Sequence, residues 1–408
     1  MTIIEFYDKN AIENIAGAMM CRPERVILIG DNHKKMADRS ATYIDILKKN
    51  SINTEILYTV IEKTNLSVAV KSLVDIVNRY EDCVFDITGG DEVYLVALGI
   101  VMERYHNVKC HRFNFVNDKI TDSDSDGHVA EVKSYDISVD DNIAIYGGRY
   151  LCEPDFDIAQ KMVDAEFVKD VETLWDICKK NPGTWNAQIG IIGAVVDNFS
   201  KEDSLSVSYN QYRVTNELGR GKGWYRIQDW LLDILESHGL IHSLTRGDDV
   251  SFTFKNKFIK KCLTVSGQVL ELFIALKLRG ILDWERKPLY NDIRVGVVIN
   301  WDDGSDEPEP AVINEIDVFA MKGAIPVFIS CKNGFVDTDE LYKLNTVADR
   351  FGGKYAKRVL VTSNHIDTDG KQEYLGERMK EMNILHINHI AKMSDLDLIK
   401  ILSTLWKE

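Results

Sequence analysis

The sequence lacks any long apolar run. Of its 408 residues, 45% are hydrophobic, yet no stretch approaches the ~20 consecutive apolar residues that a membrane-spanning helix needs. The segment Met1–Asp8 also lacks a basic region leading into an apolar one, so we expect no secretory signal. We therefore expect a cytoplasmic globular protein without a membrane partner and with enough apolar residues for two or three cores.

Paired cysteines are absent as well. The seven cysteines are scattered singly, without a Cys-x-x-Cys pair. This pattern suggests neither a disulfide framework nor a zinc site. An excess of positive charge is also lacking, because 64 Asp and Glu residues outnumber 49 Lys and Arg residues and give a formal net charge of -15 at pH 7. That charge argues against a protein that coats nucleic acid with its whole surface, but it leaves a local basic site open.

The first part of the chain alternates apolar strands with amphipathic helices. We predict strands over residues 25–30, 54–58, 83–88, 108–115 and 143–148, and helices over residues 35–49, 67–79 and 91–104. Such alternation is typical of a mostly parallel sheet with helices on both faces. The predicted fold class is therefore α/β, with a Rossmann-like N-terminal domain that would bind ligands beyond the carboxyl ends of its strands.

Two of those strand ends carry polar, glycine-containing loops. The strand over residues 25–30 runs into the segment Gly30–His33, and the strand over residues 83–88 runs into Thr88–Asp91. Glycine lets a backbone approach a ligand, and a helix N-terminus offers free N–H groups to phosphate. Neither loop has the Gly-x-Gly-x-x-Gly or P-loop spacing, so a dinucleotide enzyme is not indicated. A tight strand-to-helix turn is the alternative role of the Gly-Gly pair.

The middle of the chain has a different character. We predict helices over residues 156–179 and 186–196, then two helices and a hairpin between residues 209 and 254. This order is consistent with a helical, winged-helix-like region. Such a unit could bind DNA or serve as a dimerising spacer.

The C-terminal part carries the residues with the clearest chemistry. An apolar helix over residues 263–279 contains one acid, Glu271, and three strands follow over residues 294–300, 314–320 and 325–332. Residues two apart on a strand share a face, which pairs Glu315 with Asp317 and Ser330 with Lys332. Carboxylates and an ammonium around one point are suited to a metal ion and an activated water that attacks a phosphodiester. The alternative is a structural salt bridge between Asp317 and Lys332.

This ordered set resembles the active site of the PD-(D/E)xK restriction-endonuclease-like family. The resemblance rests on Glu271 on a helix, Asp317 on a strand, and Ser330-Cys331-Lys332 on its neighbour. It implies Mn²⁺ or Mg²⁺ bound by Glu271, Asp317 and the Cys331 carbonyl, with Glu315 in reserve, and a lysine that positions the attacking water. Ser330 departs from the family, which has Glu or Asp there, and this puts the number of metal ions in doubt.

The N-terminal loops resemble those of a CARF domain, the sensor of cyclic oligoadenylate in type III CRISPR defence. The two resemblances together imply a homodimer that shares one cyclic tetra-adenylate and becomes a nuclease when it binds. The residues implied at the ligand are Gly30, Asp31, Asn32, His33, Thr88, Gly89, Gly90 and Asp91, with Gly148 and Arg149 as a lid.

The predicted organisation has three parts. Residues 1–153 form the CARF ligand-sensing domain, residues 154–262 the helical and winged-helix-like region, and residues 263–408 the nuclease domain. The implied function is metal-dependent cleavage of DNA or RNA in antiviral defence, and the sequence does not distinguish single-stranded from supercoiled duplex substrates. The competing hypothesis is a winged-helix transcriptional regulator with a decayed nuclease domain, which Ser330 would favour.

Overall fold

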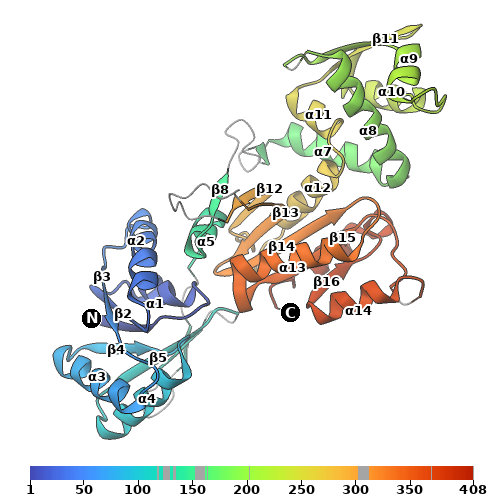
Figure 1. Ribbon diagram of the computed structural model, residues 1–408. Coiled ribbons are helices and arrows are strands. Elements are labelled where there is room, and N and C mark those ends of the chain that lie inside the picture. Colours follow the sequence, from blue (N-terminus) through green and yellow to red (C-terminus); the bar gives the residue numbers. More distant parts are fainter. Residues whose placement is uncertain are drawn as a thin grey trace.

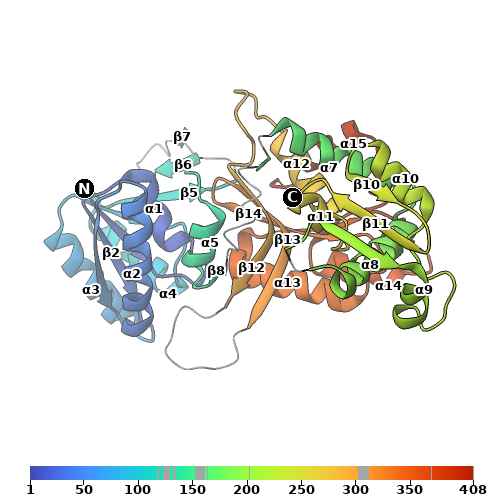
Figure 2. The same cartoon turned by 90° about the horizontal axis from the view of Figure 1, so that it is seen from above.

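The structure is a computed structural model with three sheets (Figure 1). It describes residues 1–116, 119–122, 129–131, 135–151, 161–162, 164–201, 203–301, 312–368 and 370–407. No helix within these ranges is long and apolar enough to cross a membrane. In both views the C-terminal sheet lies between the N-terminal sheet and the middle region (Figure 2).

The N-terminal sheet has seven strands in the order β3-β2-β1-β4-β5-β6-β7. The parallel strands are β1 (Thr2–Phe6), β2 (Arg25–Gly30), β3 (Glu55–Val60), β4 (Cys83–Asp86) and β5 (Lys109–Asn114), followed by the antiparallel hairpin β6 (Lys119–Asp122) and β7 (Val129–Glu131). The central strand β1 was missed by the sequence analysis. It is short, and the expected alternation of strands and helices starts only at β2.

Helices cover both faces of this sheet. They are α1 (Glu13–Cys21), α2 (His33–Lys49), α3 (Leu66–Arg79) and α4 (Glu92–Arg104). Alternate residues of β2 divide between the faces: Val26 and Leu28 pack with α1 and α2, whereas Ile27 and Ile29 pack with α3 and α4. Burial on both faces is expected for a parallel sheet. The predicted Rossmann-like arrangement is confirmed.

The strand predicted over residues 143–148 is wrong. The segment Val139–Ile145 is helix α5, whose N-cap Ser138 accepts a hydrogen bond from the N–H of Asp141 at 3.1 Å. Val139 and Ile143 are four residues apart and both buried, which is helical spacing that the sequence analysis took for strand. The next strand, β8 (Arg149–Leu151), pairs with β12 of the C-terminal sheet.

The middle region contains a small three-stranded sheet packed with helices. Its elements are α7 (Ala165–Cys178), α8 (Pro182–Phe199), β9 (Ser206–Asn210), α9 (Gln211–Arg213) with the π-helix η2 (Val214–Leu218), α10 (Asp229–Ser237), β10 (Ile241–Thr245), β11 (Asp249–Phe254) and α11 (Lys257–Cys262). The strands are antiparallel in the order β10-β11-β9. Strands β10 and β11 form the predicted hairpin. This helix-rich unit is winged-helix-like, as predicted.

The C-terminal sheet has six strands in the order β16-β15-β14-β13-β12-β8. Its further elements are α12 (Gln268–Arg279), β12 (Asp292–Asn300), β13 (Ile313–Lys322), β14 (Ile325–Lys332), α13 (Thr338–Gly352), η3 (Gly353–Tyr355), β15 (Lys357–Thr362), α14 (Glu373–Glu381), β16 (Ile384–Ile387), η4 (Ile390–Lys392) and α15 (Asp395–Leu402). Val327 and Ile329 of β14 pack on the α12 face, whereas Phe328 packs on the α13 face. The sheet is therefore buried on both sides.

One hydrophobic cluster joins the N-terminal sheet to the C-terminal sheet. It includes Leu28 of β2, Ile143 of α5, and Phe328 and Phe351 around α13. Two polar contacts fix the same junction: Asn142 Nδ2 donates to the Phe351 carbonyl at 2.7 Å, and Arg350 Nη1 donates to the Tyr146 carbonyl at 2.7 Å. The two sheets are consequently held by packing and by buried hydrogen bonds.

Gly148→Ala should destabilise this junction. A Cβ atom at Gly148 would lie 2.4 Å from Cε1 of the fully buried Phe351, so the core must shift to accept it. Overpacking of this kind costs ~1–3 kcal/mol. Gly190→Ala in α8 is the control, since no atom lies within 4 Å of its Cβ, and it should stabilise by ~0.5–1 kcal/mol. Denaturant unfolding measures both, and a neutral Gly148→Ala would contradict the packing described.

Candidate active site and ligand-binding loops

Asp317 is anchored where β13 and β14 separate. The two strands pair from Lys322–Ile325 to Val318–Ile329. One residue further along, the Asp317 carboxylate accepts a hydrogen bond from the Cys331 N–H at 2.7 Å and another from Ser330 Oγ at 3.2 Å. A side chain thus holds the two strands together beyond their last paired residues, and it fixes the carboxylate at the edge of a cavity.

Lys332 lies between two carboxylates. Its Nζ is 2.8 Å from Glu340 Oε2 and 3.7 Å from Asp317 Oδ2. Burial by itself would lower the pKa of Lys332, but Asp317 and Glu340 outweigh it and raise the pKa. The side chain is therefore a fixed ammonium. Glu340, in the first turn of α13, was missed by the sequence analysis.

Glu271 faces the same cavity from α12. The cavity has a volume of about 580 Å³, and its lining includes Glu271, Glu315, Asp317 and Lys332. Burial, followed by the nearby charges of Asp317 and Glu315, raises the pKa of Glu271 to about 8. Gln268 Nε2 donates to Glu271 Oε2 at 3.3 Å. Three predicted carboxylates and the predicted lysine are thus brought together.

Ser330 faces α13 instead. It lines a smaller hollow with Glu315, Asp317, Lys332 and Glu340, and it is not part of the larger cavity's lining. Glu315, Asp317 and Lys332 border both spaces. The site therefore straddles the end of the sheet, with Glu271 on one side and Ser330 on the other.

The carboxylates fit a divalent cation chemically, although they are not arranged around one. Burial, together with the nearby charges of Asp317 and Glu315, raises the pKa of Glu271, and a bound cation would lower it. Among the described residues, however, no group of three or more His, Cys, Asp or Glu side chains is placed to hold a metal ion. The Cys331 thiol is buried and its pKa is raised by that burial, so only its carbonyl remains a predicted ligand.

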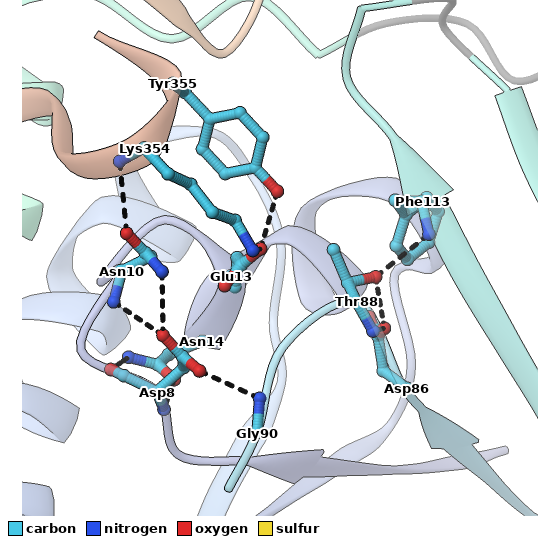
Figure 3. A network of polar contacts seen from close by, with 10 residues as sticks. All are labelled: Asp8, Asn10, Glu13, Asn14, Asp86, Thr88, Gly90, Phe113, Lys354 and Tyr355. Atoms are coloured by element: carbon cyan, nitrogen blue, oxygen red, sulfur yellow. Dashed lines mark hydrogen bonds and ion pairs between the residues drawn. The ribbon is translucent and has the colours of Figure 1, made fainter. Parts of the chain in front are cut away.

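In the N-terminal domain, the loop after β4 is held by a network of polar contacts (Figure 3). The Gly90 N–H donates to Asp8 Oδ2 at 2.9 Å, and Asn10 Nδ2 donates to Asp8 Oδ1 at 3.0 Å. Although burial opposes it, the N–H groups of Asn10 and Gly90 lower the pKa of Asp8. Thr88 Oγ1 accepts from the Phe113 N–H at 2.9 Å and donates to Asp86. The backbone of this loop is thus fixed by hydrogen bonds within the protein.

The two glycines of the loop are required by packing. A Cβ atom on Gly89 would lie 2.7 Å from Glu13 Oε2, and one on Gly90 would lie 2.7 Å from the Phe6 Cβ. Gly90 also has a φ of +121°, a conformation that favours glycine. The tight strand-to-helix turn, which was the alternative role of the Gly-Gly pair, is therefore present. The outer side of the loop faces a hollow.

That hollow has a volume of about 530 Å³. Its lining includes the segment Thr88–Gly90, Asp8, Arg112 and Lys354. Arg112 and Lys354 supply two cations at a backbone loop, a combination that suits an anionic ligand. Lys354 belongs to η3, directly after α13, so the C-terminal domain contributes to the lining. Arg112, Asp8 and Lys354 were not predicted, because only contacts between distant segments bring them together.

The loop after β2 lies beside this one. Lys63 Nζ is 2.9 Å from Asp31 Oδ2 and 3.6 Å from Asp91 Oδ2, so one ammonium connects both loops. Asn32 caps α2 by accepting from the Lys35 N–H at 3.0 Å, and the His33 ring packs edge-on against Tyr58. The predicted loops are thus neighbours.

Three predicted ligand residues have other surroundings. Gly30 is buried against Met36 and Tyr7. Gly148 packs on Phe351, and Arg149 pairs with Asn300 in the C-terminal sheet. Neither Gly148 nor Arg149 lines the hollow at Thr88–Gly90. Their role as a lid remains a prediction.

Known structures share the fold of this chain. No protein-family model matches this chain, and no curated protein matches it. The chain is similar to protein VC1899 from Vibrio cholerae, with a TM-score of 0.75 and 20% identity over 100% of this chain and 98% of that one. It is also similar to Can2 from Sulfobacillus thermosulfidooxidans in complex with cyclic tetra-adenylate, with a TM-score of 0.69 and 16% identity over 98% and 99% of the two chains.

The chain has the fold of VC1899 and Can2. A type III CRISPR defence DNA nuclease activated by cyclic oligoadenylate aligns less completely, with a TM-score of 0.50 and 14% identity over 89% of this chain and 45% of its own length. At these identities the likeness concerns the fold. It confirms the predicted α/β fold class.

In the absence of divalent cations, the stability of the protein should fall as pH rises. The pKa of Glu271 is about 8 in the folded state and near 4.5 when unfolded, so the folded state binds more protons between these values. The free energy of unfolding then decreases with a limiting slope of ~1.4 kcal/mol per pH unit from this group. Denaturant unfolding in EDTA at several pH values measures it.

Glu271→Gln should remove this slope, because glutamine does not titrate. The charged groups that face Glu271 are Asp317 and Glu315 of β13, Lys332 of β14 and Lys261 of α11. The exposed Glu373 offers a control, since Glu373→Gln should leave the slope unchanged. Equal slopes in the wild type and in Glu271→Gln would show that the carboxyl is not protonated as described.

Proposed function

We propose that this chain is a metal-dependent nuclease that cyclic tetra-adenylate activates in antiviral CRISPR defence. The observation that carries the proposal is the pairing of two candidate sites in one chain. The carboxylates and Lys332 border a cavity at the end of the C-terminal sheet, and a cation-lined hollow lies at Thr88–Gly90. The match of the fold to Can2, solved with cyclic tetra-adenylate, supports the assignment of an input and an output.

The chemistry would be hydrolysis of a phosphodiester bond in DNA or RNA. Mn²⁺ or Mg²⁺ would be held by Asp317, Glu271 and the Cys331 carbonyl, with Glu315 in reserve, and when bound it would activate a water and polarise the phosphate. Lys332, held by Glu340 and Asp317, is positioned to stabilise negative charge on the phosphate. The substrate would be a nucleic acid whose backbone reaches the cavity at the end of the sheet.

The N-terminal domain would be the sensor. Thr88, Gly89 and Gly90 would offer backbone groups, while Arg112 and Lys354 would meet phosphates of the cyclic ligand. A ring with internal symmetry is matched by a two-fold pair of identical loops, so the active species would be a homodimer. The three domains would divide at residues 153 and 262, and the protein would act in the cytoplasm.

Coupling between sensor and nuclease would pass through η3. Lys354 Nζ is 2.6 Å from Glu13 Oε1, and the Tyr355 hydroxyl donates to the same oxygen at 2.5 Å. The Lys354 N–H donates to Asn10 Oδ1 at 3.2 Å, one contact away from Asp8 and the Gly90 loop. A ligand that prefers one position of Lys354 would thereby bias the C-terminal domain.

Cleavage should require both the ligand and the active-site residues. With Mn²⁺ and cyclic tetra-adenylate, Asp317→Asn and Lys332→Met should each lower cleavage at least ~100-fold, because each removes a charge that acts on the reacting phosphate. Single-stranded RNA, single-stranded DNA and supercoiled plasmid serve as substrates, with product analysis on gels. Melting temperatures close to the wild type would separate this outcome from a structural Asp317–Lys332 pair.

Two results would contradict the proposal. Cleavage that does not respond to cyclic tetra-adenylate would remove the sensor role. Stable, sequence-specific DNA binding without cleavage would instead support the transcriptional regulator, which the winged-helix-like unit and Ser330 favour.

Tyr355→Phe should weaken activation while leaving ligand binding in place. The change deletes one hydroxyl, and with it the hydrogen bond to the buried Glu13, without touching the hollow's lining. Coupling free energies are typically worth 5–150-fold, so we expect stimulation by cyclic tetra-adenylate to drop roughly fivefold or more. The ratio of cleavage rates with and without ligand measures it. The exposed Tyr374 gives the control Tyr374→Phe, and equal ratios in both variants would exclude this route.

A further inference from the structure

The loop between η2 and α10 carries positive charge without negative charge. Its residues, Arg220–Arg226, include three exposed cations, Arg220, Lys222 and Arg226, and no Asp or Glu. The chain as a whole has a formal net charge of -15, so this loop differs in sign from the rest of the molecule. A local basic surface on an acidic protein is suited to a specific anionic partner.

The three cations are not neutralised within the protein. In the part of the chain that the structure describes, no carboxylate forms an ion pair with any of them. Other arginines of the middle region are paired: Arg213 Nε lies 2.9 Å from Glu217 Oε1, and Arg246 pairs with Asp233. The charge of the Arg220–Arg226 loop therefore remains available to a partner outside the chain.

An aromatic side chain lies among these cations. Trp224 is 63% exposed, and Lys222 Nζ lies 5.6 Å from the centroid of its ring. The next residue, Tyr225, packs against the hydrophobic core of the middle region instead. An indole that stays in water gives up the favourable burial of a large apolar surface. An exposed ring beside cations is the combination that stacks a base and meets its phosphates.

The backbone of the loop is ordered and accessible. The Gly221 N–H donates to the Thr215 carbonyl at 2.9 Å, and the Tyr225 N–H donates to the Lys222 carbonyl at 2.9 Å. A Cβ atom added to Gly221 or Gly223 would meet no atom within 4 Å beyond its chain neighbours. A partner can thus approach a loop that is already fixed, which lowers the entropy lost on binding.

Helix α8 connects this loop to the candidate active site. Gln188 Oε1 accepts from the Gln228 N–H at 2.7 Å, and Gln188 Nε2 donates to the Arg226 carbonyl at 3.3 Å. Asn186, two residues earlier on the same helix, lines the cavity that contains Asp317. The loop and the cavity are therefore held by one helix.

We propose that the Arg220–Arg226 loop binds single-stranded nucleic acid, with a base stacked on Trp224 and phosphates at the three cations. A single strand fits better than a duplex, because the face of a base is free to stack on a side chain only when it has left the helix. The inference rests on the proposed nuclease function for its biological meaning, since the loop would hold the strand that the cavity cleaves. Binding itself is measured without metal or activator.

The test is fluorescence anisotropy of labelled single-stranded DNA and RNA oligonucleotides with the full-length protein in EDTA. Trp224→Ala should weaken binding at least ~5-fold, because it removes the stacking of one base. Trp224→Phe keeps an aromatic ring and should retain most of the affinity. Trp284→Ala is the matched control, since Trp284 is 90% exposed but lies between α12 and β12, and it should bind like the wild type.

The salt dependence of binding tests the phosphate contacts. Each phosphate that a cation meets on a single strand adds ~0.7 to the slope of log Kd against log salt concentration. Lys222→Gln should therefore lower this slope by about 0.7. Lys169→Gln on α7 removes the same charge at another exposed lysine of the middle region, and it should leave the slope unchanged.

Four results would overturn the proposal. The first is a wild type that does not bind single strands, and the second is wild-type affinity in both Trp224→Ala and Lys222→Gln. The third is a duplex of the same sequence that binds as tightly as the single strand, which would point to duplex recognition by the winged-helix-like unit. The fourth is poly-glutamate that competes as well as an oligonucleotide of equal charge, which would show attraction of any polyanion.

Cleavage assays separate this proposal from the nuclease function. A wild type that never cleaves, but whose binding of single strands depends on Trp224 and Lys222, would leave the loop's role standing and remove the nuclease function. A wild type that cleaves with Mn²⁺ and cyclic tetra-adenylate, beside Trp224→Ala and Lys222→Gln variants that bind and cleave equally well, would do the reverse.

Discussion

Helix α13 is held at its two ends by different parts of the molecule. At its start, Glu340 pairs with Lys332 on β14; at its end, Phe351 packs on Gly148, and the following Tyr355 bonds to Glu13 of the N-terminal domain. Closely packed elements shift as units when one of their contacts changes. A change at the Thr88–Gly90 loop that displaces Glu13 is therefore connected to the ammonium of the candidate active site through one rigid helix.

A buried glutamate with a raised pKa lies at each end of this connection. In the C-terminal domain, Glu271 has a raised pKa because it is buried beside other carboxylates. In the N-terminal domain, burial raises the pKa of Glu13, and its bonds to Lys354 and Tyr355 offset only part of that effect. The negative charge of each acid would be stabilised by a cation beside it. A phosphate in the hollow would compete with Glu13 for Lys354, just as a divalent cation would compete with Lys332 for Asp317.

The sequence predicts what depends on local pattern. Apolar, β-branched runs located β14 at its observed bounds. Spacing along the strands placed Asp317 and Lys332 at one site, and the resemblance to the PD-(D/E)xK family added Glu271, which lines the same cavity. Local pattern does not predict contacts between distant segments. Glu340 is one of several acids at the start of a helix, and its contact with Lys332 is not visible in the sequence. Lys354 lies more than three hundred residues from its partner Glu13. The strand predicted over residues 143–148 is wrong for another reason. A short buried helix and a short buried strand have similar composition, so composition does not separate them.

Ser330 acquires a physical explanation once Glu340 is considered. A glutamate at position 330, added to Glu340, would place another negative charge beside Asp317 and Glu315, where burial and nearby negative charge already raise the pKa of Glu271. Like charges at such separations raise one another's pKa and weaken the folded state. The serine at position 330 instead adds no charge and donates a hydrogen bond to Asp317.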